Sequence, residues 1–377
     1  MTKPLPHVLV SGVCLGQPPG GVRRHNAELL PRLAERLERG GGSLTVLEGR
    51  VPITFPLPPS VERIQTRVHW LPTHLRAAAE PGALARAIQD AHRAGRPFDL
   101  VHTAHLPTPR SLQLPFTLTI HDLRSLDLDR APFVRRLIGG KVLARATDDA
   151  ARIFVVSEWM RTRVCETFPS AAEKVRVIGN GLDHLPLKER SPTKAPFLLH
   201  VGHLEPRKNL DLLVRALATD PHLPPLVLAG LAKGSTLEDL RRLAMSLGVE
   251  GRVRHEEAPT DERIAELYAA ASCAAFPSRL EGHGLGPLEA YRAGCPAAAS
   301  DIPAHLESLA RLPEGSISLF AVDDPAACAR AINAAMQGNS ARRPTPAAFR
   351  AFRALPTWDA CADAWVAGLE EAHGSES

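Results

Sequence analysis

Apolar runs alternate with longer segments of helical periodicity along the first half of the chain. Residues 7–13 (HVLVSGV) are typical of a buried strand, and a glycine-rich loop is expected at 16–21. Residues 22–39 then place leucines four residues apart, on one face of a helix. The same pattern predicts three later strands, at residues 98–104, 115–122 and 151–157.

The second half repeats this alternation after a polar, proline-bearing stretch at residues 184–196. Strands are expected at 197–203, 225–230, 253–258 and 273–278, and helices at 209–218, 237–248 and 261–271. Alternating strands and helices are typical of parallel sheets covered by helices. The chain is therefore predicted to be an α/β protein of two doubly wound, Rossmann-like halves, with a ligand cleft between them.

The length of 377 residues also favours two domains, because it exceeds what one hydrophobic core usually organises. We expect an N-terminal domain at 1–185, a linker at 186–196, a C-terminal domain at 197–345 and a final helical segment at 346–377. Within 344–372, large apolar residues recur at three- and four-residue intervals, which predicts one amphipathic helix.

Composition excludes several classes of protein. Hydrophobic residues make up 44% of the chain and charged residues 23%, which is typical of a globular protein and unlike a disordered one. The six cysteines contain no CxxC pair, so we expect reduced thiols in a cytoplasmic protein and no zinc site. We expect neither a secretory signal nor a membrane span, because no apolar stretch reaches roughly 18 residues.

Charge is distributed unevenly. Residues 1–190 contain 27 Lys and Arg against 18 Asp and Glu, a net charge of +9, whereas residues 191–377 contain 18 against 23, a net charge of −5. A basic half attracts phosphates, anionic lipid surfaces or nucleic acid. Nucleic acid is the least favoured partner, because aromatic residues are only 5% and no stacking pattern is found.

The most specific pattern lies in residues 276–303, which pass from a strand end through a glycine-rich loop into a short helix. Gly282, Gly284 and Gly286 allow the backbone to approach a ligand closely, and the helix that follows presents free N–H groups. This geometry suits a diphosphate. The alternative is a dinucleotide fingerprint, but the spacing is GxGxG instead of GxGxxG, and Asp301 comes too early. A dehydrogenase is thus the weaker interpretation.

Four charged residues are the candidates for chemistry in the second half. Glu281 precedes the glycines and would bind sugar hydroxyls, while Glu289 would bind ribose hydroxyls. Arg207 and Lys208 follow the first strand of this half, where two cations can neutralise a diphosphate leaving group. The alternatives are solvated glutamates beside a turn and a solvated basic pair.

These motifs resemble the retaining glycosyltransferases of family four, whose hallmark is two glutamates separated by seven residues. The resemblance spans nearly the whole chain and rests on seven segments in order: 20–35 (GGVRRHNAELLPRLAE), 119–123 (TIHDL), 152–164 (RIFVVSEWMRTRV), 201–217 (VGHLEPRKNLDLLVRAL), 281–296 (EGHGLGPLEAYRAGCP), 299–307 (ASDIPAHLE) and 357–365 (TWDACADAW). It implies a GT-B fold whose last helix crosses back to the N-terminal domain.

The resemblance also implies an activity. The chain would move a hexose from a GDP- or UDP-linked donor to a glycan or lipid-linked acceptor, with retention of configuration, no bound metal and no cofactor. The N-terminal domain would bind the acceptor and the C-terminal domain the nucleotide sugar. Cell-surface polysaccharide or glycolipid synthesis, for example by a mannosyltransferase, is the expected context. A non-catalytic nucleotide-sugar-binding protein of the same fold is the alternative.

Site residues follow from the same resemblance. The implied catalytic residues are His121, Arg207, Lys208 and Glu281. The implied donor-binding residues are Gly20, Gly21, Arg207, Lys208, Gly282, His283, Gly284, Leu285 and Glu289. His283 departs from the family, which usually has phenylalanine there, and we expect this change to alter sugar choice without abolishing catalysis. Tyr291, Arg292 and Ala293 replace the common Met-Ala-Cys and are interpreted as helix-surface or core variation.

Three features of the basic half have competing interpretations. Gly20 and Gly21 would close toward the donor, or form a plain tight turn. His121 would lie near the transferred sugar, or be a structural histidine; with His102 and His105 it would make a three-histidine metal site, which is the least favoured option. Residues 132–146 mix cationic and apolar residues, so they would rest on the inner face of an anionic membrane or simply pack.

Overall fold

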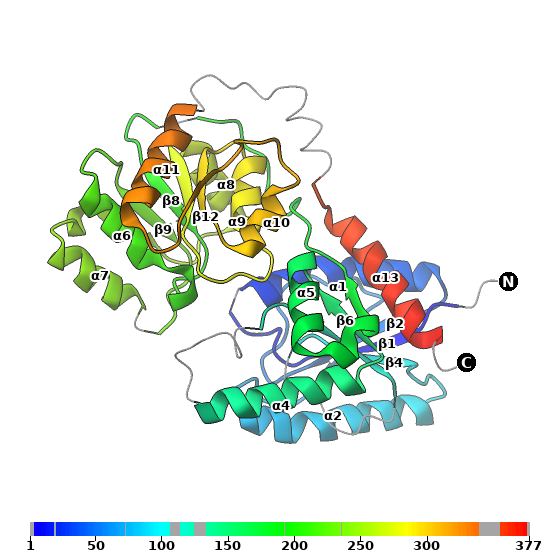
Figure 1. The fold of residues 1–377 in the computed structure, drawn as a ribbon. Helices are drawn as coiled ribbons and strands as arrows, with labels where there is room; N and C mark the ends of the chain where they lie inside the picture. Colours follow the sequence, from blue (N-terminus) through cyan, green and yellow to red (C-terminus); the bar gives the residue numbers. More distant parts are fainter. Residues whose placement is uncertain are drawn as a thin grey trace. The chain divides into compact units, whose positions relative to one another are not determined.

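The computed structural model describes residues 4–18, 20–71, 73–105, 114–123, 133–191, 193–234, 236–338 and 355–374, without the side chains of 133–138. The chain divides into two compact units, one made of residues 1–180 and 358–377 and the other of residues 181–357 (Figure 1). Each unit has its own sheet, with a buried core on each face of it.

The first unit contains a parallel sheet of seven strands among the described residues, in the order β3-β2-β1-β4-β5-β6-β7. Its strands are β1 (His7–Gly12), β2 (Ser43–Glu48), β3 (Glu62–Gln65), β4 (Leu100–Thr103), β5 (Phe116–Ile120), β6 (Arg152–Val155) and β7 (Val175–Val177). Its helices are α1 (Gly21–Arg39), α2 (Thr73–Arg93), α4 (Phe133–Asp149), α5 (Glu158–Thr167) and α13 (Trp358–Gly374), with the 3-10 helix η1 (Pro169–Lys174).

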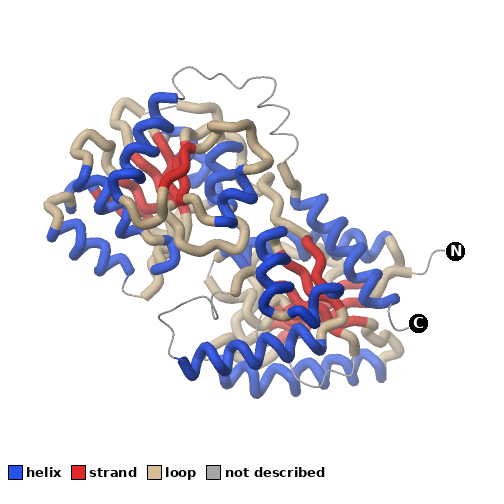
Figure 2. Tube along the Cα trace, viewed as in Figure 1, coloured by secondary structure: helices blue, strands red, loops and turns tan. Residues whose placement is uncertain are grey.

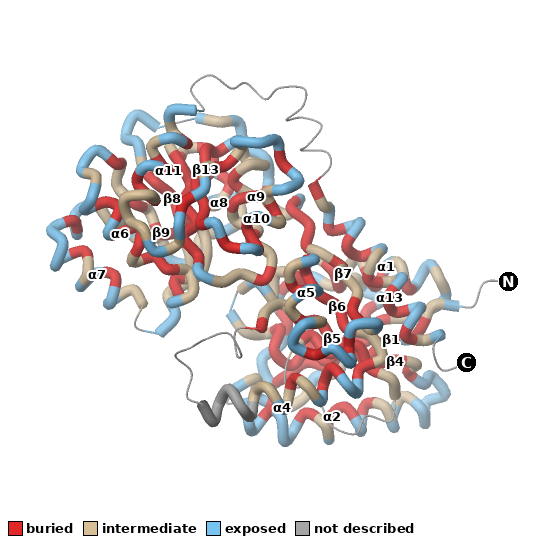
Figure 3. The backbone as a smooth tube through the Cα atoms, in the orientation of Figure 1, coloured by how far each residue is buried: buried red, intermediate tan, exposed pale blue. Residues whose placement is uncertain are grey.

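Side-chain alternation along the strands gives the first sheet two separate cores. Val8 and Val10 of β1 pack with α1 and α13, whereas Leu9 between them packs with α2, α4 and α5. Successive residues of a strand point to opposite faces, so helices must cover both. Figure 2 shows the strands enclosed by helices, and Figure 3 shows that the central strands of the sheets are mostly buried.

The second unit repeats this plan with six parallel strands among the described residues, in the order β10-β9-β8-β11-β12-β13. The strands are β8 (Leu198–Val201), β9 (Leu226–Ala229), β10 (Val253–Glu256), β11 (Cys273–Phe276), β12 (Ala297–Ser300) and β13 (Ser318–Phe320). The helices are α6 (Leu210–Thr219), α7 (Thr236–Ser246), α8 (Asp261–Ala270), α9 (Leu285–Arg292), α10 (Pro303–Leu309) and α11 (Pro325–Gly338), with the 3-10 helices η2 (Pro206–Lys208) and η3 (Glu250–Arg252). The prediction of two doubly wound halves is confirmed.

The C-terminal helix α13 belongs to the first unit, as expected, although residues 344–354 of the predicted segment lie outside the described residues. Trp365 is completely buried, with its ring edge-to-face against His102 at 4.7 Å. Gly368 is required beside it, because a Cβ there would lie 2.3 Å from the Phe154 ring. Arg36 of α1 also pairs with Asp359 of α13 at 3.0 Å.

The structure differs from the expected linker at residues 186–196. The division between the units falls after Asn180, and the following segment is built into the second unit. Leu185 is buried in the core of that unit, and the Arg190 Nη1 donates to the carbonyl of Tyr268 at 2.6 Å. Polar composition and prolines indicated a linker. Leu185 and Arg190 instead attach this segment to the second unit.

The six cysteines, all within the described part of the chain, form no disulfide, and all but Cys165 are buried. No helix among the described residues combines the length and the apolar character needed to cross a membrane.

The basic stretch 132–146 lies partly outside the described residues. Residue 132 and the side chains of 133–138 are not described, so its proposed lipid-facing role stays a prediction.

Replacing Trp365 by alanine should lower the free energy of unfolding by about 3–5 kcal/mol, because it empties a large buried volume between α13 and the sheet. Denaturant unfolding measures this loss. The matched control is Trp159→Ala on α5, where the ring is only partly buried and the loss should be about 1 kcal/mol or less. Equal losses in the two variants would contradict the assigned role of Trp365.

Candidate functional site

Strands β8 and β11 lie side by side at the centre of the second sheet, and the chain order reverses between them. From β8 the chain continues to β9 on one side, whereas β11 and the later strands lie on the other. Ligands of doubly wound sheets bind outside the carboxyl ends of the strands at such a switch point. Residues that follow β8 and β11 are therefore the candidates for a binding site in this unit.

The segment after β8 carries two cations on a single 3-10 turn, η2. Arg207 and Lys208 occupy this turn, which ends at Asn209 in the left-handed conformation with φ of 53°. The Asn209 side chain donates to the Val322 carbonyl at 2.8 Å, which anchors the turn to the loop after β13. The backbone of the turn that carries both cations is thus anchored.

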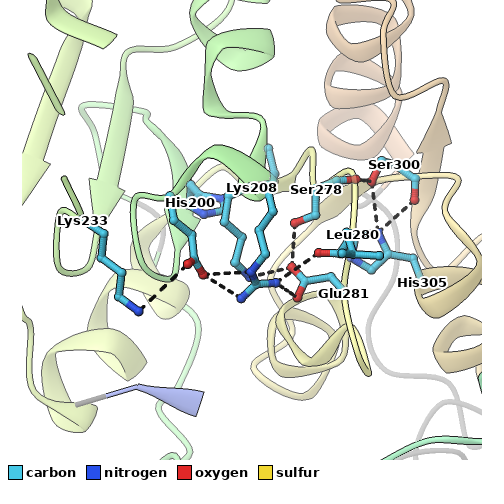
Figure 4. Close-up of polar contacts among 11 residues, drawn as sticks. His200, Lys208, Lys233, Ser278, Leu280, Glu281, Ser300 and His305 are labelled. Carbon is cyan, nitrogen blue, oxygen red and sulfur yellow. Dashed lines mark hydrogen bonds and ion pairs between the residues drawn. The ribbon is translucent and has the colours of Figure 1, made fainter. Parts of the chain in front are cut away.

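Both cations contact the same carboxylate, Glu281, which follows β11. Figure 4 shows Lys208 and Ser278 beside Glu281. The Arg207 Nη1 lies 2.5 Å from Oε2 of Glu281, and the Lys208 Nζ lies 2.6 Å from Oε1. Ser278 adds a third bond, with its hydroxyl donating to Oε1 at 2.7 Å. These distances bring the cation pair of η2 to the carboxylate that directly precedes the glycine turn.

The Arg207, Lys208 and Glu281 side chains are only 19, 16 and 11% exposed, respectively. Burial alone would raise the pKa of Glu281, but Lys208 and Arg207 outweigh it and hold the pKa well below its usual range. Glu205 lies on the other side of Arg207, at 2.7 Å, and 4.0 Å from Lys233. The cluster is therefore an alternating set of charges in a partly desolvated place, where electrostatic interactions are strong.

Two buried histidines border this cluster (Figure 4). The His200 Nδ1 lies 2.9 Å from the Ala275 carbonyl, and burial together with Lys208 lowers its pKa to about 4. His305 is bound to the Ser300 carbonyl at 2.9 Å, and burial lowers its pKa as well. Both rings are therefore neutral near pH 7. The negative charge of Glu281 is balanced by the positive charges of Arg207 and Lys208.

The glycine turn leads from Glu281 directly into α9. Gly284 has φ of +78°, and a Cβ on it would lie 2.7 Å from Cδ2 of His305, so only glycine fits. Gly286 is equally confined, because a Cβ there would lie 2.4 Å from the Phe276 ring. The His283 carbonyl accepts a hydrogen bond from Ser308, which holds the turn closed against α10.

Glu289, in the middle of α9, has partners of its own. Its Oε1 lies 3.3 Å from Nε2 of His184, and its Oε2 accepts a hydrogen bond from the Tyr268 hydroxyl at 3.3 Å.

The first unit holds the other predicted residues. Gly20 caps α1 in an extended conformation, and a Cβ on Gly21 would meet nothing within 4 Å.

His121 follows β5 in the first unit, with its ring edge-to-face against His25 at 4.6 Å. The alternative of a three-histidine metal site lacks the expected arrangement. His102 lies 2.9 Å from the Thr117 hydroxyl, and His105 pairs with Glu80 at 3.1 Å. No cluster of three or more His, Cys, Asp or Glu side chains suited to a metal occurs in the part of the chain that the structure describes.

Comparison with known proteins decides the family. The model of the family "Glycosyl transferases group 1" matches residues 184–350, and that of "Glycosyltransferase Family 4" matches residues 19–184. The chain belongs to the group 1, family 4 glycosyltransferases. The family membership expected from the motifs is confirmed, and the dehydrogenase interpretation is wrong.

Several curated relatives are glycosyltransferases. The chain is 30% identical over 296 residues to the D-inositol 3-phosphate glycosyltransferase of Salinispora arenicola, covering 73% of this chain and 63% of the relative. It is 28% identical over 222 residues to the O-antigen chain mannosyltransferase B of Escherichia coli, covering 54% and 57%. The chain thus spans less than two thirds of the length of each of these two relatives.

Solved structures show the fold. Sucrose-phosphate synthase from Thermosynechococcus elongatus superposes with a TM-score of 0.75 at 21% identity, covering 95% of this chain and 96% of that one. The Anabaena protein HepE, in complex with UDP and glucose, gives a TM-score of 0.70 at 18% identity, covering 97% and 99%. The fold is GT-B, as predicted.

Several members of the site were missed by reasoning from sequence. Glu205 lies in the segment 201–217 and Ser278 in the pattern at 276–303, but nothing in their spacing marked them as partners of Arg207 and Glu281. Tyr268 fitted the apolar face of a helix, and His184 lay in the polar, proline-bearing stretch at 184–196, just before the expected linker. Only their contacts with Glu289 distinguish them.

Replacing Glu281 by glutamine should lower the free energy of unfolding by about 3 kcal/mol at neutral pH, because the partly buried cations Arg207 and Lys208 lose the carboxylate that they share. The folded pKa of Glu281 lies below its usual value of 4.5, so its stabilisation is complete above that pH and is lost as the pH falls toward the folded pKa. The difference in free energy of unfolding between wild type and Glu281→Gln should therefore decrease below about pH 4.5.

Urea denaturation at several pH values measures this difference. Glu314→Gln is the matched control, since Glu314 is exposed in the loop before β13 and should change stability by less than about 0.5 kcal/mol. A Glu281→Gln effect that is the same at pH 3 and pH 7 would contradict the ion-pair origin of the stabilisation.

Proposed function

We propose that this protein transfers a hexose from a UDP- or GDP-linked donor to a glycan or lipid-linked acceptor, with retention of anomeric configuration. The observation that carries the proposal is the convergence of Arg207 and Lys208 on Glu281 beside the switch point of the second sheet. Two fixed cations at this position are suited to phosphate oxygens, which accept the same charge-assisted hydrogen bonds as a carboxylate.

The chemistry of transfer requires such cations. When the bond between the anomeric carbon and the diphosphate breaks, negative charge develops on the leaving oxygen. Arg207, Lys208 and the N-terminal end of α9 would stabilise that charge without rearranging, because η2 and the glycine turn already fix them. We therefore propose that the reaction needs neither a bound metal nor a cofactor, since protein cations take the place of a metal.

The proposed reaction is a front-face displacement. The acceptor oxygen bonds to the anomeric carbon on the side from which the diphosphate leaves, and the acceptor proton passes to the departing phosphate oxygen. Glu281 would hold hydroxyls of the sugar and Glu289 those of the ribose. Gly282, His283, Gly284 and Leu285 would line the diphosphate. Gly20, Gly21 and His121 of the first unit would contact the donor and the transferred sugar.

The acceptor class is inferred from the relatives and from charge. Curated relatives include enzymes named for O-antigen mannosyl transfer and for inositol 3-phosphate, which supports an acceptor in cell-surface polysaccharide or glycolipid synthesis. Residues 1–190 carry a net charge of +9, which favours contact with an anionic membrane surface. We propose a cytoplasmic protein that acts at the inner face of that membrane.

Replacing Arg207 or Lys208 by alanine should lower kcat about 10²–10³-fold, because each removes one stabiliser of the leaving group. The measurement is donor hydrolysis or sugar transfer, after thermal shifts with UDP, GDP and their sugars identify the donor. Arg215→Ala is the matched control, as Arg215 is half exposed on α6 and pairs only loosely with Asp211 at 4.0 Å.

Two results would contradict the proposal. If no nucleoside diphosphate raises the melting temperature, the second unit does not bind such a donor. If a nucleotide sugar binds tightly but neither hydrolysis nor transfer occurs with any of many acceptors, the protein is a non-catalytic binding protein of the same fold.

A further inference from the structure

Helix α2 begins with its charged side chains turned inward and its apolar ones turned outward. Arg76 and Glu80, near its start, are 5% and 1% exposed, whereas Leu75 is 58% exposed. The three alanines at 77–79 are exposed as well. A helix on the surface of a domain usually buries its apolar side chains and exposes its charged ones. The outer side of this end of α2 is therefore mainly apolar.

The inward charges have partners inside the first unit, and these partners explain the reversal. The Arg76 Nη1 lies 2.5 Å from Sγ of Cys14, and its Nε lies 3.5 Å from the Glu80 carboxylate. Glu80 in turn accepts a hydrogen bond from Ser11 and pairs with His105. These contacts fix the rotation of α2 about its axis, so its apolar side stays outside.

Two loops extend this apolar surface. Val51 follows β2 and is 41% exposed, and Leu71 precedes α2 and is 49% exposed. The Arg50 backbone N–H donates to the Val68 carbonyl at 2.7 Å, which ties the loop after β2 to the loop after β3. In the described part of the first unit, all exposed large hydrophobic side chains belong to this set: Val51, Leu71 and Leu75. Exposed apolar side chains that gather in one place indicate an interaction surface.

The charges that flank these apolar side chains are positive. Arg50 and Arg67 are exposed and follow the carboxyl ends of β2 and β3. Residues 49–85 contain four arginines and two acidic residues. Of the two acids, Glu80 is buried, and Glu62 lies at the opposite, amino end of β3. The exposed charges that this stretch places beside the apolar side chains are therefore those of arginine.

We propose that these five side chains form a docking surface for an anionic lipid bilayer: Arg50, Val51, Arg67, Leu71 and Leu75. The apolar side chains enter the boundary between headgroups and acyl chains, and the guanidinium groups bind lipid phosphates. A second copy of this chain is a less suitable occupant, because its docking surface carries the same positive charge. Charge complementarity thus favours the anionic bilayer.

The place of the docking surface in the fold agrees with this occupant. Parallel strands end at one edge of a sheet, so the loops after β2 and β3 lie at the same edge of the first sheet as His121, which follows β5. The inference rests on the proposed function here, because a bilayer at this edge presents a lipid-linked acceptor where the sugar is transferred. It assigns bilayer contact to residues outside the basic stretch 132–146.

The experiment measures cosedimentation of the full chain with vesicles of equimolar phosphatidylglycerol and phosphatidylcholine, and with vesicles of phosphatidylcholine alone. Wild type should bind the anionic vesicles, and binding should weaken as the salt concentration rises. The double variant Leu71→Ser, Leu75→Ser should lower the partition coefficient about tenfold or more, because less apolar area enters the bilayer. Arg50→Gln with Arg67→Gln should lower it about tenfold or more for the anionic vesicles only.

Met245→Ser is the matched control, because Met245 is 67% exposed on α7 of the second unit. It should leave the partition coefficient as in wild type. The melting temperature of each variant, with and without UDP or GDP, shows whether the fold and donor binding are retained.

Trp70 provides a second measurement on the unchanged chain, since it directly precedes Leu71. Brominated lipid should quench tryptophan fluorescence in bound wild type, and Trp70→Phe should bind vesicles but lose this quenching. If the leucine variant fails to fold, the quenching of Trp70 decides the proposal by itself.

Three results would overturn the inference: wild type does not bind anionic vesicles, the folded leucine variant binds them as wild type does, or bound wild type shows no quenching that depends on Trp70. If the leucine variant converts a dimer into a monomer and vesicle binding is unchanged, the surface is instead a contact between copies of this chain. Sugar transfer is tested separately by donor hydrolysis. Loss of vesicle binding with hydrolysis retained overturns only the inference, whereas vesicle binding without hydrolysis or transfer contradicts the proposed function.

Discussion

The ion pairs between Glu281 and the two cations of η2 are the interaction on which the second unit's site depends. A carboxylate that is 11% exposed is costly to ionise unless opposite charges and hydrogen bonds compensate it, and Arg207, Lys208 and Ser278 supply both. These contacts also join the segment after β8 to the segment after β11. The same contacts therefore stabilise the fold of the unit and position the residues of the site.

The first unit also has a buried carboxylate with compensating partners at its own switch point, between β1 and β4. Ser11, near the end of β1, donates to Glu80 of α2, and His105, just after β4, lies 3.1 Å from the same carboxylate. Burial acts to lower the pKa of His105, but Glu80 outweighs it and raises the pKa to about 9. Each sheet thus places buried, compensated charge where its strand order reverses.

Much of this arrangement follows from the sequence, for a geometric reason. Parallel strands end at one edge of a sheet, so Arg207, Lys208 and Glu281 could be predicted to meet although more than seventy residues separate them. Tyr268 and His184 could not be predicted in the same way. A tyrosine on the apolar face of a helix has the pattern of a core residue, and a histidine among prolines has that of a loop. Their role depends on contacts between segments, which periodicity does not encode.

The two glutamates of the hallmark motif have different environments, and this difference bears on the proposed reaction. Glu281 is bound by permanent cations, whereas Glu289 is held by a tyrosine hydroxyl and a histidine. Under the proposed function, a diphosphate would draw Arg207 and Lys208 toward its own oxygens and leave lone pairs of Glu281 for sugar hydroxyls. Glu289 is contacted by Tyr268 and His184 and not through η2, so the exchange proposed at Glu281 leaves these two contacts in place. Phosphate binding and sugar binding would therefore be coupled at Glu281, while ribose binding at Glu289 would stay independent of both.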